Sequence, residues 1–370
     1  MEYAAEGAKT WGSKPFLSLA DHHVRVRSMK IVYSDKQKLH SPMREWNFGK
    51  LVPYPEKEKR LEVILKALKK RGYDSNIIKP RKYSISHILK VHDKTMVKHI
   101  KSCADLKDGE AVHAHIFPYR AYGAHPKTNL KLAGYFCFDV GTQIVNHTYE
   151  AAKAAVDCAL HGADQILSGK ENVVFALTRP PGHHADLEIY GGYCYFNNAA
   201  IAASHMLPKG RVAIVDLDFH HGNGTQSIFY ETPNVYFISI HGNPANHYPY
   251  CSGFKNERGA KLGEGLNLNI PLPTGTGDNE YRIKLKKICR IISRWKPDYL
   301  VLSVGFDTFK DDPLGDFNLT SPFYKEIGAI FVSLGIPLLA CLEGGYSIKA
   351  LGTNVANFCD GLASSENKEV

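Results

Sequence analysis

The six residues from Asp216 to His221 read Asp-Leu-Asp-Phe-His-His, and they directly follow the apolar run 212–215. Alternate side chains of a β-strand share a face, so Asp216, Asp218 and His220 are expected to point the same way. Burying such groups without partners costs on the order of several kcal/mol each. A bound metal removes that cost, and carboxylate oxygen with imidazole nitrogen is a ligand set that suits zinc. The stretch therefore predicts a metal site at the end of a core strand, with a third protein ligand elsewhere.

Apolar and helix-like segments alternate along most of the chain. Strands are predicted at 173–177, 212–217, 235–240, 299–304 and 337–342. Helices are predicted at 148–168, 197–207, 278–295 and 321–334. This alternation is typical of a parallel sheet covered by helices on both faces. The expected fold class is therefore α/β, with one main domain.

Composition excludes several classes of function. Hydrophobic residues make up 44% and charged residues 22% of the 370, which is ordinary for a globular protein with a large core. No apolar run approaches the ~20 residues of a membrane span. The eight cysteines include no CxxC pair, which favours reduced thiols and a cytoplasmic location. The net charge of +9 is spread over the chain, so no nucleic-acid partner is expected.

Polar residues follow each predicted strand where it ends. In chain order they are Arg179 with His183 and His184, then Asp218, His220 and His221, then His241, then Asp307, and finally Glu343 with Tyr346. In open parallel sheets, ligand sites form outside the carboxyl ends of the strands. We therefore expect five strand ends to deliver their polar residues to one crevice.

The predicted zinc ligands are Asp218, His220 and Asp307, because catalytic zinc keeps three protein ligands and one open position. Asp307 ends an apolar run in which Gly305 allows a close backbone approach. Taken alone, Asp307 would be read as a helix N-cap. The second strand end, with its two aspartates and histidine, favours the metal reading.

His183 and His184 follow the stiff turn 180–182, which fixes the direction of the two rings. A single histidine is more often a satisfied core or surface residue, but two at a strand end near a metal site favour proton transfer. Hydrolysis needs a base for the attacking water and an acid for the departing amine. Tyr346, after two glycines, is either a core aromatic or a donor to a carbonyl oxygen that becomes an oxyanion.

Three further residues are expected around these groups. Asp216 either holds a neighbouring histidine or binds a monovalent cation together with backbone carbonyls and Ser239. Asn223 is expected to orient the other histidine of the pair. Both predictions assign these polar side chains a supporting role for the residues that react.

Five segments together resemble a known family: RPPGHHA, GGYCYFNN, DLDFHHGNGTQ, the Asp307 segment and EGGY. They resemble the zinc-dependent histone deacetylase superfamily, which has the arginase–deacetylase fold. The resemblance runs from about Lys30 to Gly361. It implies one Zn²⁺ on the three predicted ligands, His184 as general base and acid, His183 as an electrostatic aid and Tyr346 as the group that polarises the scissile carbonyl.

The resemblance also implies structural K⁺ and an acyl-lysine tunnel. One potassium site would use Asp216, Asp218, His220, Ser239 and Ile240, and another would use carbonyls near Phe229, Thr232 and Val235. Tyr193 and Tyr248 match the aromatic walls of the tunnel, beside Gly192.

Within the superfamily the chain is most similar to the bacterial acetylpolyamine amidohydrolases. Asn223 replaces the aspartate typical of class I enzymes, which makes the chain class II-like. The stretch at about 105–130 matches that group's inserted loop and implies a homodimer with a narrowed channel. Glu45 and Glu110 lie where the group places acidic residues near a cationic substrate. The expected domain spans 29–363, between a peripheral extension, 1–28, and a polar tail, 364–370.

The expected activity is zinc-dependent removal of acetyl groups from acetylated polyamines or related small cationic amides by metal-activated water. A protein acetyl-lysine deacetylase with the same chemistry is the first alternative. A catalytically silent acetyl-lysine binding protein is a weaker one, because every catalytic position, including Tyr346, is present. An arginase-like two-manganese enzyme would need further Asp and His ligands and is rejected.

Overall fold

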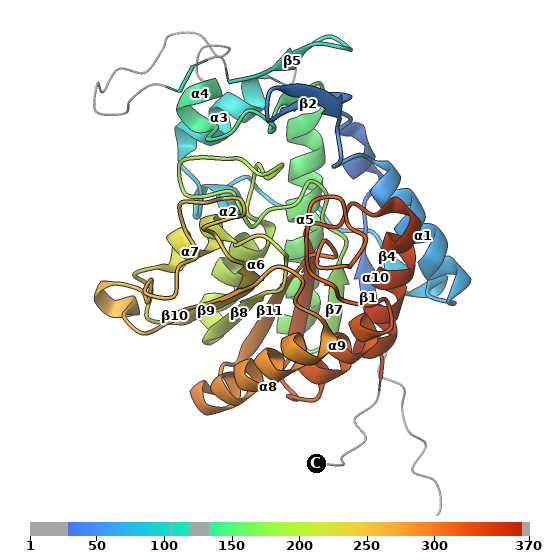
Figure 1. Cartoon of the computed structure of the whole chain (residues 1–370), viewed down its shortest axis with the longest axis vertical. Coiled ribbons are helices and arrows are strands. Elements are labelled where there is room, and N and C mark those ends of the chain that lie inside the picture. Colours follow the sequence, from blue (N-terminus) through green and yellow to red (C-terminus); the bar gives the residue numbers. More distant parts are fainter. Residues whose placement is uncertain (1–28, 104–105, 115, 118–132, 365–370) are drawn as a thin grey trace, which may run out of the picture.

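The computed structural model describes residues 29–103, 106–114, 116–117 and 133–364. At its centre lies an eight-stranded sheet in the order β10-β9-β8-β11-β12-β7-β1-β4, whose neighbouring strands pair in parallel (Figure 1). Its strands are β1 (Lys30–Val32), β4 (Ile77–Ile78), β7 (Val173–Ala176), β8 (Val212–Asp216), β9 (Val235–Gly242), β10 (Asn267–Leu272), β11 (Tyr299–Val304) and β12 (Leu338–Leu342). The predicted α/β class with a parallel sheet is confirmed.

Helices cover both faces of this sheet. Those on one side are α1 (Lys59–Lys70), α8 (Asp278–Trp295), α9 (Phe323–Val332) and α10 (Ile348–Leu362). Those packed on the other core include α2 (Ser86–Leu89), α3 (Lys94–Ser102), α4 (Ala133–Phe136), α5 (Thr148–Leu167) and α6 (Asn198–Met206). The short helix α7 (Asn223–Phe229) follows the end of β8.

Strand β8 shows why the core strands read as continuous apolar runs. Ala213 and Val215 belong to the core beneath α8 and α9, whereas Val212 and Ile214 belong to the core beneath α5 and α6. Because both faces of a parallel strand are covered, alternation with polar residues is lost. The helices are amphipathic instead, and α8 buries one stripe while Ile283 remains exposed.

Two small antiparallel pairs lie outside the central sheet, and Figure 1 shows β2 and β5 together at one end of the molecule. β2 (Arg44–Asn47) and β3 (Lys50–Pro53) form a hairpin, and β5 (Ala111–Val112) pairs with β6 (Ile144–Val145). Phe48 and Gly49 both have positive φ, which is the pattern of a two-residue type I′ turn. The hairpin carries Glu45 to the site.

Each of the five predicted strands is present, with ends within about two residues of those expected. The edge strand β10 was not predicted, because its sequence contains two asparagines and Pro271. Proline is tolerated at a sheet edge, where its missing N–H breaks no ladder bond. No helix among the described residues is long and apolar enough to cross a bilayer.

Three stretches named from the sequence lie wholly or largely outside the described residues. They are the extension 1–28, most of the inserted loop at 105–130, and the tail beyond Ser364. Their assigned boundaries stay predictions.

Candidate metal centre and channel

Asp218, His220 and Asp307 converge beyond the ends of β8 and β11. One potential ligand atom from each lies within 4.8 Å of the others. His220 Nδ1 is 3.2 Å from Asp218 Oδ1 and 3.1 Å from Asp307 Oδ2. Both aspartates are buried and the His220 side chain is 15% exposed, so the group is reachable from one side. Two carboxylates and one imidazole with an open side form a donor set that fits zinc.

The turn after β8, rather than strand alternation, places two of these side chains. β8 ends at Asp216, and Asp218 and His220 lie in the irregular segment that follows. Hydrogen bonds from the backbone to aspartate side chains stabilise this segment. The N–H of Asp218 donates to Asp216 Oδ1, and the N–H of His220 donates to Asp218 Oδ1. The expectation that three alternate residues continue one strand face was therefore wrong in its geometry, although the residues it named do meet.

Burial and mutual charge set the protonation of the two aspartates in opposite directions. Burial, reinforced by the charge of Asp218, raises the pKa of Asp307 to about 7. Burial also acts on Asp218, but the neighbouring charges of His183 and His220 outweigh it and lower the pKa of that carboxyl. Two buried carboxyls this close resist carrying two negative charges, and a divalent cation between them would relieve the repulsion.

His183 and His184 have opposite electrostatic surroundings. His183 Nδ1 is 3.0 Å from Asp216 Oδ2, and although burial opposes its charge, Asp216 and Asp218 raise the pKa of His183 to about 10. His184 Nδ1 donates to Asn223 Oδ1 at 2.7 Å, which leaves Nε2 as the acceptor atom of the ring. Burial, followed by the charge of His183, holds the pKa of His184 well below its usual range. The pair thus combines a charged ring with a neutral one.

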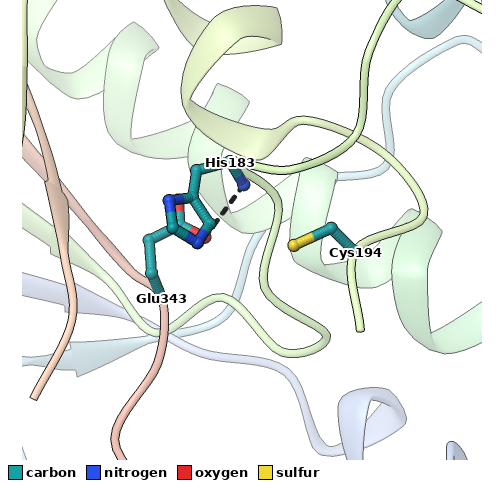
Figure 2. A group of neighbouring side chains, drawn as sticks. All are labelled: His183, Cys194 and Glu343. Atoms are coloured by element: carbon teal, nitrogen blue, oxygen red, sulfur yellow. Dashed lines mark hydrogen bonds between the residues drawn. The ribbon is translucent and has the colours of Figure 1, made fainter. Parts of the chain in front are cut away.

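A second group of potential ligand side chains consists of His183, Cys194 and Glu343 (Figure 2). The Glu343 carboxylate is already used, because it accepts from the backbone N–H groups of Gly182 and His183 at 2.6 and 3.2 Å and from Ser303 Oγ at 3.1 Å. Burial raises the pKa of the Cys194 thiol, which disfavours a thiolate. Glu343 therefore anchors the turn that carries both histidines.

Tyr346 is held through its backbone and by the Arg60 guanidinium, which lies against its ring. Its N–H and that of Ser347 both donate to Asp312 Oδ2, at 2.6 and 2.8 Å. The Arg60 guanidinium lies 5.0 Å from the centre of the Tyr346 ring and donates to the carbonyl groups of Gly345 and Glu343. Burial raises the pKa of the Tyr346 hydroxyl, so it remains a donor at neutral pH.

A cavity of about 420 Å³ leads to these groups, a size that suits a small organic ligand. Its lining includes His183, His184, His220, Tyr346, Gly192, Tyr193, Tyr248, Glu45 and Asp139. The Tyr248 ring meets the His184 ring edge-on at 4.9 Å, and the Tyr193 ring lies 5.9 Å from the Tyr346 ring. A methyl group on Gly192 would lie 2.2 Å from the His184 ring, so only glycine fits there. The predicted aromatic residues therefore line the channel.

The two acidic residues expected near a cationic substrate lie in different places. Glu45 is 3% exposed, accepts from Tyr193 Oη at 3.1 Å, and has a second oxygen without a protein partner. Burial raises the pKa of the Glu45 carboxyl to about 7. Glu110 is exposed, accepts from the N–H of Lys107, and lines a different cavity beside the hairpin. Within this chain Glu110 is therefore not part of the channel.

The residues expected to bind potassium, apart from Asp218 and His220, lie on β8, on β9 and between the end of α7 and the start of β9. Asp216 and Ser239 are register partners on β8 and β9, and Ile240 follows in β9. Ser239 Oγ is 3.1 Å from His221 Nδ1 and 2.7 Å from His241 Nδ1. The other residues predicted for potassium, Phe229, Thr232 and Val235, run from the end of α7 to the start of β9.

Sequence reasoning missed three residues that support the site, namely Arg60, Asp139 and Asp312. Glu343 was expected at a strand end, within the EGGY segment, but no role in holding the histidine turn was assigned to it. Arg60 is 285 residues from the carbonyl to which it donates, so no local pattern reveals it. The other two act through backbone N–H groups, which leave no mark in the sequence of their partners.

Residues 54–362 match the family model for the histone deacetylase domain. The chain belongs to this family. It is 39% identical to the acetylpolyamine amidohydrolase of Mycoplana ramosa over 90% of this chain and 100% of that protein. Acetylpolyamine amidohydrolase 1 of Pseudomonas aeruginosa is also 39% identical, over 90% of this chain and 98% of that one. The resemblance read from the motifs is therefore confirmed, and the chain is a deacetylase-type hydrolase.

Solved structures of the family share the fold. The acetylpolyamine aminohydrolase of Burkholderia pseudomallei superposes with a TM-score of 0.86 at 33% identity, covering 91% of this chain and 99% of that one. The HD domain of HDA15 gives a TM-score of 0.78 at 29% identity, covering 91% and 90%. The single-domain arginase–deacetylase fold expected from the motifs is confirmed.

Proposed function

We propose that this enzyme is a zinc-dependent amidohydrolase that removes acetyl groups from acetylated polyamines or related small cationic amides. The observation that carries the proposal is the placement of a proton-accepting imidazole, a tyrosine hydroxyl and a three-residue metal donor set around one narrow cavity. The names of the similar bacterial amidohydrolases support the same substrate class.

The metal would be held by Asp218, His220 and Asp307. Bound there, zinc would supply a Lewis acid that acidifies water and polarises the acetyl carbonyl. Asp216 and His183 lie next to these ligands. The 3.0 Å contact between the Asp216 carboxylate and the His183 ring stabilises the positive charge of the imidazole. Structural potassium at the end of β8 and β9 is part of the proposal, with the Ser239 hydroxyl and nearby carbonyls as ligands.

Two side chains act on the proton and on the developing charge, and a third orients one of them. His184 Nε2 accepts a proton as water attacks the acetyl carbon and returns it to the departing amine. The Tyr346 hydroxyl donates a hydrogen bond to the carbonyl oxygen as negative charge develops there. Asn223 holds His184 in the required tautomer through the 2.7 Å hydrogen bond to Nδ1.

The remainder of the substrate would lie between Tyr193 and Tyr248. Its ammonium group would be received by Glu45, whose second oxygen is buried in the channel without a protein partner. A homodimer formed through the segment at 105–130 would narrow the entrance further. That assembly is proposed from the family resemblance alone.

The test compares amine release from N-acetylputrescine and from an acetyl-lysine peptide by the zinc-loaded protein, with His184→Ala as control. We expect turnover of the small amide to exceed that of the peptide, because a narrow channel hinders a peptide backbone. His184→Ala should lower kcat by about 10²–10⁴-fold, the usual contribution of a positioned base. Better turnover of the peptide would assign the enzyme to protein deacetylation, and no turnover of either substrate would contradict acetyl hydrolysis.

A further inference from the structure

Asp139 is a half-buried carboxylate in the channel lining that accepts five hydrogen bonds. Oδ1 accepts from the backbone N–H groups of Gly141 at 3.0 Å and Thr142 at 2.7 Å. Oδ2 accepts from Thr142 Oγ1 at 3.1 Å, Gly192 N at 2.6 Å and Tyr248 Oη at 2.9 Å. A carboxylate offers about four acceptor sites, so this one is fully used.

These five bonds join three segments that are distant in the sequence. Asp139 and Thr142 belong to the loop after α4, Gly192 to the turn after the two histidines, and Tyr248 to the loop after β9. Thr142 extends the connection, because its Oγ1 also accepts from the backbone N–H of Tyr193 at 2.8 Å. A single carboxylate therefore holds the Tyr248 hydroxyl directly and the Tyr193 backbone through one hydroxyl.

The segments held in this way touch the reacting groups. The Tyr248 ring meets the His184 ring edge-on, with 4.9 Å between centres, and also stacks on Phe138 at 5.9 Å. Gly192 lies against His184 so closely that a methyl group there would come within 2.2 Å of the ring. A shift of either segment would change the width of the channel beside the proton-transferring imidazole.

We propose that Asp139 is a positioning residue for the substrate, a carboxylate that sets the spacing of the channel segments carrying Gly192, Tyr193 and Tyr248. The proposal rests on the amidohydrolase function proposed above. Asp139 acts through the residues it holds, and its own oxygens have no acceptor capacity left for a ligand.

The geometry requires a carboxylate rather than an amide. Asparagine would replace one oxygen by an NH₂ group, which donates. In one orientation that group would face the N–H groups of Gly141 and Thr142, and in the other it would face the N–H of Gly192. Donor would face donor in either case, so Asp139→Asn should loosen at least one segment while almost preserving side-chain volume.

The test measures kcat/KM for the trifluoroacetyl amides of butylamine and methylamine, whose activated carbonyl groups favour measurable rates. Asp139→Asn should lower the ratio of butyl to methyl kcat/KM by about tenfold, because only the butyl chain depends on the spacing of the channel. This ratio does not depend on the fraction of active enzyme. General loss of structure or metal would lower both rates equally and leave the ratio unchanged.

Two further variants separate positioning from stability. Asp164→Asn removes another half-buried aspartate with several donors, among them His205 Nε2 at 2.9 Å, on the outer side of α5. It should leave the ratio unchanged even if the melting temperature falls. Thr142→Val removes only the bridging hydroxyl, so it should lower the ratio in the same direction by a smaller factor. This variant provides the test if Asp139→Asn folds poorly.

An unchanged butyl-to-methyl ratio in both Asp139→Asn and Thr142→Val would overturn the proposal. A fall in kcat/KM for trifluoroacetylputrescine without a fall for the butyl amide would also overturn the proposal, because Asp139 would then act on the ammonium group by charge alone. Failure of the wild-type enzyme to hydrolyse any of these amides would instead contradict the proposed amidohydrolase function. Failure of the Asp139 proposal can therefore be told apart from failure of the proposed function.

Discussion

At the scale of single residues, two carboxyl groups in one channel have different surroundings. Asp139 accepts five hydrogen bonds, whereas Glu45 has one oxygen bonded to Tyr193 and the other without a protein partner. A methyl group at Gly141 would lie 3.3 Å from that free oxygen, so glycine lets the backbone approach it closely without covering it with a side chain. A fully bonded carboxylate holds structure, and a buried unbonded one is suited to receive a cation.

The pKa of Glu45, raised to about 7 by burial, predicts a pH-dependent preference for cationic substrates. Below pH 7 the carboxyl is mostly neutral and cannot pair with an ammonium group; above pH 7 it is ionised. The tyrosines facing it, Tyr193 and Tyr54, have pKa values raised well above their usual range, so they do not titrate there, and Asp139 adds negative charge. The ratio of kcat/KM for N-acetylputrescine to that for N-butylacetamide should therefore rise through about pH 7.

The matched variants for this prediction are Glu45→Gln and Glu45→Ala. Both should give a lower ratio that does not change with pH, since neither side chain ionises. Using a ratio cancels the titration of groups that act on both substrates. A wild-type ratio that is flat from pH 6 to 8, or equal losses on both substrates in Glu45→Ala, would remove Glu45 from substrate recognition.

At the scale of elements, the metal centre depends on how closely the backbones beyond β11 and β12 approach the turn after β8. A methyl group on Gly305 would lie 2.1 Å from Asp218 Oδ2 and 2.6 Å from Asp307 Oδ1. A methyl group on Gly344 would lie 2.3 Å from Asp307 Oδ2, and the Gly344 N–H donates to Asp218 Oδ2 at 2.8 Å. Small residues at these strand ends are therefore a condition for the ligands to meet.

Gly305→Ala should accordingly weaken zinc binding by about 10–100-fold, a typical effect of disturbing the groups that orient metal ligands. The measurement is competition for zinc with a chromophoric chelator. Gly277→Ala is the matched control, because a methyl group at Gly277 has no neighbour within 4 Å. Equal zinc affinity in wild type and Gly305→Ala would contradict the prediction, because the strand ends could then move apart without weakening the binding of zinc.

At the scale of the whole molecule, the site joins segments from most of the chain. The turn carrying His184 and the segment carrying Tyr346 meet because parallel strands end at one edge of the sheet, and the separate hairpin carrying Glu45 lines the same cavity. Asp218 and Asp307 are buried side by side in the folded state and solvated in the unfolded state. A cation that binds only the folded arrangement must therefore stabilise the fold.

Removing zinc with a chelator should lower the melting temperature of the wild-type enzyme by about 5 °C. A ligand present at a hundred times its Kd contributes about 2.7 kcal/mol, and large domains shift by roughly 2 °C per kcal/mol. His184→Ala keeps the ligand set and should show the same shift, whereas Asp307→Ala should show almost none. An unchanged wild-type melting temperature, with metal loss verified by elemental analysis, would contradict a stabilising metal at this site.

Local sequence determined the chemistry and the main elements of this protein. A strand buried on both faces must be apolar throughout, so β7, β8, β9, β11 and β12 stood out, and the polar residues at their ends supplied the proposed metal ligands, the histidine pair and Tyr346. Four of the five family motifs lie at these strand ends, and GGYCYFNN lies in the loop before α6.

Only the tertiary structure decided which distant groups hold those residues in place. The five hydrogen bonds of Asp139, the reach of Arg60 to a strand end 285 residues away, and the separate positions of Glu45 and Glu110 have no local sequence signal. The physical reason is that backbone N–H and carbonyl groups are present at every residue. Which of them meets a given side chain depends on how the whole chain packs.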